Sequence, residues 1–238
     1  MRIETTPHPE WVRNFLEEIG PYTDRIMNGP YFDEMAAGTL SMSRFRGGLL
    51  NFYPLIEDFP AYMGHAIQKV PRGRSRRNDM ARDWLMQNIN IERKHTLWYR
   101  QWAIDFGVPR KAFDRPIVPP PEIDAINNFL WRTVSHGTVA ECIAAVNYGI
   151  EGPSGEWTKR VEPNIRKYEG RDGVTFRRST LFWIKAHAAY DDMHTPEALE
   201  LIKAFATTRR EQEKATRAAL RSMAYYAMAA DACYREFS

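Results

Sequence analysis

The chain has 238 residues, of which 44% are hydrophobic and 13% aromatic, and this is enough for one sizeable core. We therefore expect a single domain over residues 1–238. The formal net charge is only +3, from 33 basic and 30 acidic residues, so charge gives no general argument for a nucleic-acid partner.

Two cysteines and the absence of long apolar runs indicate where the protein works. Cys142 and Cys233 are too far apart for a disulfide framework, and neither belongs to a Cys-x-x-Cys pair of the kind that binds zinc. The sequence has no apolar signal stretch at its start and no run of about 18 apolar residues. We expect a cytoplasmic protein with reduced thiols and no membrane span.

The first half of the sequence predicts three helices. Residues 9–20, PEWVRNFLEEIG, start with proline and end with glycine, as helices often do. A second helix is expected from about Ser41 to Gln68, because its apolar residues are three and four apart. Pro54 and Pro60 would kink that helix. A basic loop then leads to a third helix, from about Asp79 to Phe106.

The second half continues in the same way after a proline-rich connector. Further helices are expected at Glu122–His136, at Thr138–Glu151 and from Gly155 to about Lys167. A helix that includes residue 183 should end near His194, because a proline at 196 disfavours helical geometry in the residue before it. Thr195 would then cap the last helix. No segment alternates as a strand, so we predict an all-α bundle of about seven helices.

The segment WIKAHAAYDDMHTPEALELI, residues 183–202, carries three potential metal ligands on one helical face. His187, Asp191 and His194 are at positions i, i+4 and i+7, which lie within roughly 60° of one another around a helix. Burying three polar groups on an apolar helix is costly unless they are satisfied. A metal would satisfy them. The alternative is that both histidines are core residues hydrogen-bonded to backbone.

A second helix offers partners for such a site. In NINIERKHTLWY, Glu92 and His95 are three residues apart and share a face. Carboxylate-bridged di-iron bundles use this Glu-x-x-His unit, although the motif alone is weak evidence.

Two acidic residues in apolar surroundings complete the candidate set. Glu57 and Glu151 could each contribute a carboxylate, with Asp58 and Glu141 as nearby rivals, and Glu151 could also simply end a helix in solvent. Mixed imidazole and carboxylate ligands suit iron or manganese better than structural zinc. We therefore predict a di-iron(II) centre with the candidate ligands Glu57, Glu92, His95, Glu151, His187, Asp191 and His194.

Three segments resemble the haem-oxygenase-like di-iron oxidases: NINIERKHTLWY, IAAVNYGIEGPSGEWT and WIKAHAAYDDMHTPEALELI. Among these oxidases, the undecene-forming medium-chain fatty-acid decarboxylases are the most similar. The resemblance implies a haem-oxygenase-like, TenA/PqqC-like bundle without haem. It also implies that all seven candidates are iron ligands of the catalytic centre, with Glu57 chosen over Asp58 and Glu151 over Glu141. The thiamin-salvage and quinone-cofactor branches of the fold do not use this complete set.

The same resemblance implies an O2-dependent reaction. Two Fe(II) ions would form a peroxo-bridged diferric species and convert a medium-chain fatty acid into a terminal alkene, with external electrons as a possible requirement. The alternative is N-oxygenation, carbon–carbon cleavage or nitrile formation on an amine or amino acid, because the same ligands serve those reactions.

Partners other than the small-molecule substrate are suggested by one loop only. Its basic residues could attract an acidic carrier protein, although an ordinary solvated loop is the favoured explanation: Lys69, Arg72, Arg74, Arg76 and Arg77. A homodimer is also compatible with this fold.

Overall fold

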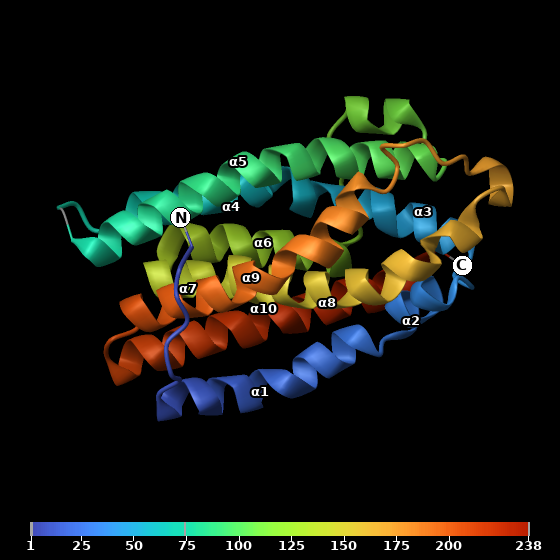
Figure 1. Ribbon diagram of the computed structural model, residues 1–238. Coiled ribbons are helices and arrows are strands. Elements are labelled where there is room, and N and C mark those ends of the chain that lie inside the picture. Colours follow the sequence, from blue (N-terminus) through green and yellow to red (C-terminus); the bar gives the residue numbers. More distant parts are fainter. Residues whose placement is uncertain (1, 74, 238) are drawn as a thin grey trace.

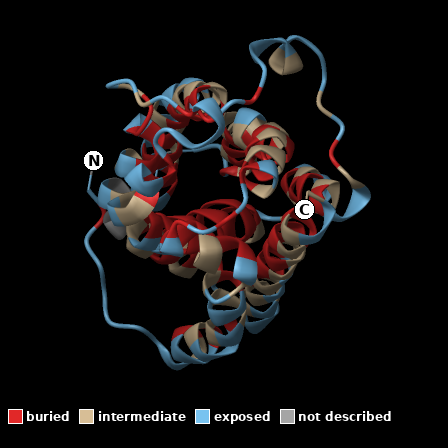
Figure 2. Cartoon of the chain, turned by 90° about the vertical axis from the view of Figure 1, so that its right-hand side faces the viewer, coloured by how far each residue is buried: buried red, intermediate tan, exposed pale blue. Residues whose placement is uncertain are grey.

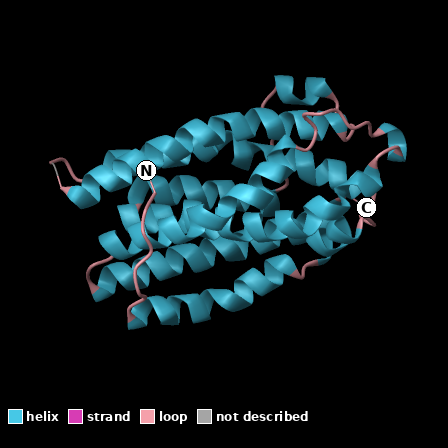
Figure 3. Ribbon diagram, in the orientation of Figure 1, coloured by secondary structure: helices cyan, strands magenta, loops and turns pink. Residues whose placement is uncertain are grey.

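The computed structural model describes residues 2–73 and 75–237, apart from the side chains of residues 190–193. Throughout this part of the chain the secondary structure is helical, without strands (Figures 1 and 3). The all-α fold class predicted from the sequence is therefore confirmed. The α-helices are α1 (Glu10–Met27), α2 (Pro30–Ala37), α3 (Met42–Asn51), α4 (Tyr53–Lys69), α5 (Arg76–Asp105), α6 (Pro121–His136), α7 (Val139–Ile143), α8 (Gly152–Val161), α9 (Phe182–Phe205) and α10 (Arg209–Glu236).

Shorter helical segments join some of these helices. They are the 3-10 segments η1 (Arg110–Asp114), η3 (Glu162–Tyr168) and η4 (Arg171–Gly173), and the π-helical segment η2 (Ala144–Glu151). The segments are more numerous than the seven predicted because local breaks divide several of the expected helices, and because α2, η1 and η4 lie where the sequence predicted no helix.

Prolines and glycines interrupt the first helices less than the sequence predicted. The predicted end of the first helix at Gly20 is wrong, because α1 continues through Pro21 to Met27. Its apolar face, including Phe15 and Ile26, is buried, and this packing outweighs the hydrogen bond that Pro21 cannot donate. The expected second helix is two helices that meet at Phe52, while Pro60 lies inside α4 without breaking it.

The most consequential correction concerns α9. The helix does not end near His194, and Thr195 does not cap the next one, because α9 runs through Pro196 to Phe205. The residues after the proline are held by the core, with Leu201 and Ile202 fully buried. The last helix begins only at Arg209, where Thr208 and Glu211 form a capping box.

The long helices lie roughly along one direction and enclose a continuous apolar core (Figure 1). Buried residues face inward on each helix when the bundle is viewed from its end (Figure 2). Three tryptophans form a stacked column in this core, with ring centroids 5.2 Å apart for Trp102 and Trp183 and 5.8 Å apart for Trp183 and Trp157. No described helix is long and apolar enough to cross a membrane.

Two glycines within helices provide a test of how tightly this core is packed. A Cβ at Gly48 of α3 would overlap the hydroxyl of the buried Tyr31, whereas a Cβ at Gly64 of α4 meets no atom within 4 Å. We expect Gly48→Ala to lower the free energy of unfolding by about 1–3 kcal/mol through overpacking. The matched Gly64→Ala should raise it by roughly 0.5–1 kcal/mol through helix propensity. Urea denaturation of both variants measures the difference, and equal stabilities would contradict the close contact at Gly48.

Candidate metal centre

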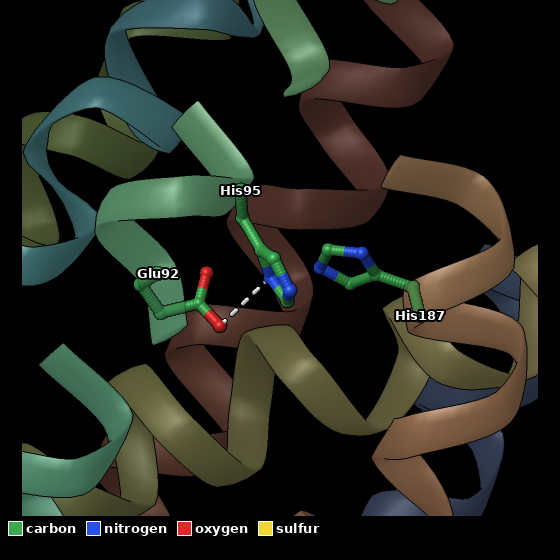
Figure 4. Close-up of side chains that lie close together, drawn as sticks. All are labelled: Glu92, His95 and His187. Atoms are coloured by element: carbon green, nitrogen blue, oxygen red, sulfur yellow. Dashed lines mark ion pairs between the residues drawn. The ribbon is translucent and has the colours of Figure 1, made fainter. Parts of the chain in front are cut away.

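Three potential ligands converge in the middle of the bundle from two helices. Glu92 and His95 lie one turn apart on α5, and His187 lies on α9 (Figure 4). One ligand atom from each residue lies within 4.8 Å of the others. All three side chains are buried, with 6%, 2% and 6% of their surface exposed. The sequence-predicted pairing of these two helices across one site is therefore present in the structure.

Glu92 and His95 approach each other without completing a hydrogen bond. His95 Nδ1 lies 3.0 Å from Glu92 Oε1, yet this nitrogen is buried without a hydrogen-bond partner. Burial acts to raise the pKa of Glu92, but His95, and then His187 and His194, lower it. A buried imidazole beside a buried carboxylate, with a second imidazole close by, is an arrangement that a metal ion would satisfy.

His187 is held in the form that a metal requires. Its Nδ1 lies 2.9 Å from the backbone oxygen of Trp183, and a carbonyl can only accept, so Nδ1 donates and Nε2 keeps its lone pair. Burial, together with the neighbouring His95, lowers the pKa of His187 to about 4, and the imidazole is therefore neutral at physiological pH. Its ring stacks on Trp183 at 3.9 Å and lies 4.5 Å from the ring of His95. A hydrogen bond to the backbone is what we expected if His187 were only a core residue. Histidine ligands of metals usually make such a bond as well, because it orients the ring.

A second polar pair lies beside the first group. Glu151, the last residue of η2, places Oε2 3.3 Å from Nδ1 of His194 on α9. Asn147 donates a hydrogen bond of 2.9 Å to the other oxygen, while Oε2 itself is buried without a hydrogen bond. Burial raises the pKa of Glu151, whereas the Glu151 carboxylate overcomes burial and raises the pKa of His194.

Glu92 connects the two sets electrostatically. Its carboxylate acts on the pKa of His194 and of Glu151, as well as on that of His187. Three of the seven predicted ligands, Glu92, His95 and His187, therefore lie within 4.8 Å of one another, and the buried Glu151 and His194 are coupled to Glu92 electrostatically. Three imidazoles and two carboxylates are a donor set that suits iron.

The other two predicted ligands are not placed in this group. Glu57 is exposed on α4, where it accepts a hydrogen bond of 3.1 Å from Tyr53. The side chain of Asp191 lies outside the described residues. Metal binding by Glu57 and Asp191 therefore stays a prediction.

The two acidic rivals considered from the sequence have structural partners of their own. Asp58 accepts a hydrogen bond of 2.9 Å from the indole nitrogen of Trp131. Glu141 completes a capping box with Thr138 at the start of α7. Sequence reasoning overlooked Asn147 and Trp183 as supporting residues, although each lies four residues before a candidate ligand and so on the same helical face.

An apolar cavity of about 40 Å³ lies next to these groups. Ile150, which precedes Glu151, and Trp183, which stacks on His187, both line it. The rest of the lining is mainly aromatic and aliphatic, with a few hydroxyl groups, and no charged side chain contributes to it. The space beside the candidate ligands is therefore suited to an apolar group.

The cysteines offer no competing centre. Cys142 and Cys233 are both buried and free. Burial raises the pKa of Cys142 to about 12 and also raises that of Cys233, so neither thiol is available as a thiolate nucleophile.

The basic loop between α4 and α5 is partly tied to the bundle. Lys69 donates to the backbone oxygen of Ser135, and Arg77 donates to that of Ala204. Arg72 and Arg76 are exposed, whereas Arg74 lies outside the described residues. Docking of an acidic carrier protein at this loop stays a prediction, as does a homodimer.

Comparison with known proteins places the chain in a family. Residues 46–227 match the model of the family described as iron-containing redox enzymes. This match covers most of the sequence, and the chain therefore belongs to that family. No curated protein matches it significantly.

Several solved structures are similar to this chain in fold. A TenA homologue from Pseudomonas syringae pv. tomato is 28% identical, with a TM-score of 0.86 over 98% of this chain and 99% of that one. A TenA homologue from Pyrococcus furiosus is 17% identical (TM-score 0.75, coverage 94% and 100%). A domain of unknown function with a haem-oxygenase-like fold from Shewanella denitrificans is 14% identical (TM-score 0.76, coverage 95% and 93%). The predicted haem-oxygenase-like fold is confirmed.

The Glu92, His95 and His187 group predicts a specific effect of iron on stability. Anaerobic ferrous iron at about 100 times its dissociation constant should stabilise the protein by about 2.7 kcal/mol. For a chain of this size we expect a rise in melting temperature of about 5–10 °C. Calorimetry should show this rise for the wild type and its loss in Glu92→Ala and His187→Ala. His65→Ala, which changes an exposed histidine on α4, is the control. An unchanged rise in His187→Ala would contradict the site.

Proposed function

We propose that this iron-containing redox enzyme is a non-haem di-iron oxidase that consumes O2. The observation that carries the proposal is the burial of Glu92, His95 and His187 beside the Glu151–His194 pair, with His95 Nδ1 and Glu151 Oε2 buried without a hydrogen bond. Buried imidazoles and carboxylates in a helical bundle are typical of di-iron carboxylate proteins. When bound, ferrous iron would supply the electrons with which oxygen is reduced.

The candidate ligands can be assigned to two ions. His95 and His187 would hold one ion and His194 the other, and Glu92, which acts electrostatically on both sets, would contribute its carboxylate. Glu151 would bind through Oε2, because Asn147 already occupies its other oxygen. Glu57 and Asp191 remain proposed additional ligands that could complete the centre during the reaction.

The cavity beside the site supports an apolar substrate. Its lining offers no charged side chain to pair with an ammonium group, so an aliphatic chain fits it better than an amino acid does. We therefore favour oxidative decarboxylation of a medium-chain fatty acid. A hydrogen leaves the carbon β to the carboxylate, the bond to the carboxyl carbon breaks, and a terminal alkene and carbon dioxide are formed. Oxygen is reduced to two waters if an external donor supplies two further electrons.

The size of the cavity adds a condition to this reaction. Its volume of about 40 Å³ is far below the roughly 300–1,000 Å³ of small-molecule pockets. A medium-length chain would therefore need side chains of the lining to move. Met35 is the most adaptable of them, because its unbranched side chain has several rotatable bonds.

The reaction can be tested by loading the protein with iron first and then comparing different substrates. Metal-free protein is loaded anaerobically with ferrous iron and mixed with oxygenated buffer, alone, with dodecanoic acid or with free amino acids. Visible absorption is recorded after mixing, and the headspace is analysed for undecene. We expect oxygen consumption and alkene only with the fatty acid. A response only to an amino acid would retain the oxidase and reject the decarboxylation, whereas no response to any substrate in iron-loaded protein would contradict both.

The two histidines of α9 provide the matching variants. His187→Ala and His194→Ala should each lower oxygen-dependent turnover at least a hundredfold, because each removes a candidate iron ligand, while circular dichroism shows an intact helical fold. His65→Ala again serves as the control, since its ring packs near Trp131 and not near the site. Full activity in His194→Ala would remove that residue from the centre.

A further inference from the structure

A basic groove lies between α6 and α10, at one end of the pair that they form. The two helices are antiparallel: Glu122 near the start of α6 pairs with Arg235 near the end of α10, and Phe129 packs against Tyr225 at 5.2 Å. The groove has a volume of about 310 Å³. That is the lower end of the range for small-molecule sites, roughly 300–1,000 Å³.

Positive side chains line this groove from both helices. Arg132 and His136 are four residues apart on α6. Lys214, Arg217 and Arg221 occupy positions i, i+3 and i+7 of α10 and so share one face. Two helices therefore direct basic side chains into the same space.

Very little negative charge balances these cations. The one carboxylate in the lining, Glu141, is engaged at Oε2 by the backbone N–H of Thr138. None of the four lysine and arginine side chains forms an ion pair with a carboxylate among the described residues. Three positive charges thus remain uncompensated when His136 is neutral. Elsewhere on the surface, several arginines do have acidic partners, as in Arg25–Asp231 and Arg209–Glu213.

Like charges on one helical face are unfavourable unless an anion joins them. Arginine recognises phosphate oxygens well, because its planar guanidinium donates two parallel hydrogen bonds. A terminal phosphate carries a charge of about −1.5 to −2 near neutral pH, and the inner phosphate of an organic diphosphate carries one further negative charge, so a total of about −3 matches the uncompensated charge of the groove. Phe129 and Ala218 add an apolar part to the lining, on which an organic group could rest.

We propose that the groove between α6 and α10 binds a small organic diphosphate, with its phosphates on Arg132, Arg217 and Arg221 and its organic part on Phe129. None of the candidate metal ligands lines this groove. The binding site is therefore independent of the proposed oxidase function, and either can fail without the other.

Isothermal titration calorimetry of the full chain with inorganic pyrophosphate and with adenosine 5′-diphosphate tests the proposal. We expect one saturable site per chain for both probes. Arg217→Gln/Arg221→Gln should weaken binding at least tenfold. The matched control is Arg209→Gln/Arg210→Gln, which removes the same charge from the start of α10 outside the lining and should change binding by less than twofold. Tighter binding of adenosine diphosphate than of pyrophosphate would support the place assigned to the organic group.

Three results would overturn the site. Absence of saturable binding, or an equal loss in both double variants, would reduce the groove to a generally basic surface. Loss of binding in His187→Ala with the groove intact would show that pyrophosphate binds at the metal centre instead. Equal affinities for the two probes would overturn the role of Phe129. Circular dichroism of each variant verifies that the fold is retained.

Discussion

The structure depends on the burial of two carboxylates in an aromatic core. Glu92 and Glu151 are only 6% and 4% exposed, and removing a carboxylate from water costs several kcal/mol unless it is paired. The protein compensates with three imidazoles and one amide, but it leaves ligand atoms of His95 and Glu151 without hydrogen bonds. A core optimised for stability alone would contain apolar residues here. Bound cations would offset the free-energy cost of burying these carboxylates. Metal binding would therefore stabilise the folded bundle.

The π-helical segment η2 is the second feature that this region requires. A π-helix has i→i+5 backbone hydrogen bonds, is rare, and appears mostly as a short insertion in α-helices, frequently at functional sites. Ser222 of α10 donates a hydrogen bond of 2.6 Å to the carbonyl of Ala145, which lies inside η2. Gly149 permits the approach of α10, because a Cβ there would come within 2.9 Å of the Ser222 Cβ. An adjacent helix thus supports the unusual segment that presents Asn147 and Glu151 to the site.

Helical periodicity made part of the site predictable from the sequence. Helical spacing alone places Glu92 and His95 on one face of their helix, and His187 and His194 on one face of theirs. This holds for any packing of the two helices. Glu151 could be chosen over Glu141 only through family resemblance, because one sequence does not reveal that a helix changes from α to π geometry between them. The sequence also could not predict that Glu57 is exposed. Which face of α4 points to solvent depends on how the helix is oriented about its axis after the break at Phe52. Tertiary packing, not local propensity, decides these positions.

The continuity of α9 through Pro196 shows that tertiary packing outweighs the tendency of a proline to end a helix. This happens directly after His194, one of the candidate ligands. A helix that ended at His194 would fray at that residue, whereas an unbroken helix holds His187 and His194 two turns apart on one face. Glu197, in the turn after His194, supports this arrangement. It accepts hydrogen bonds from the backbone of Ile3 and from the indole of Trp84, whose ring lies 6.1 Å from that of His194. The N-terminal segment and α5 thus hold the helical turn that follows His194 through their hydrogen bonds to Glu197. These contacts favour the helical geometry of the turn that contains Pro196.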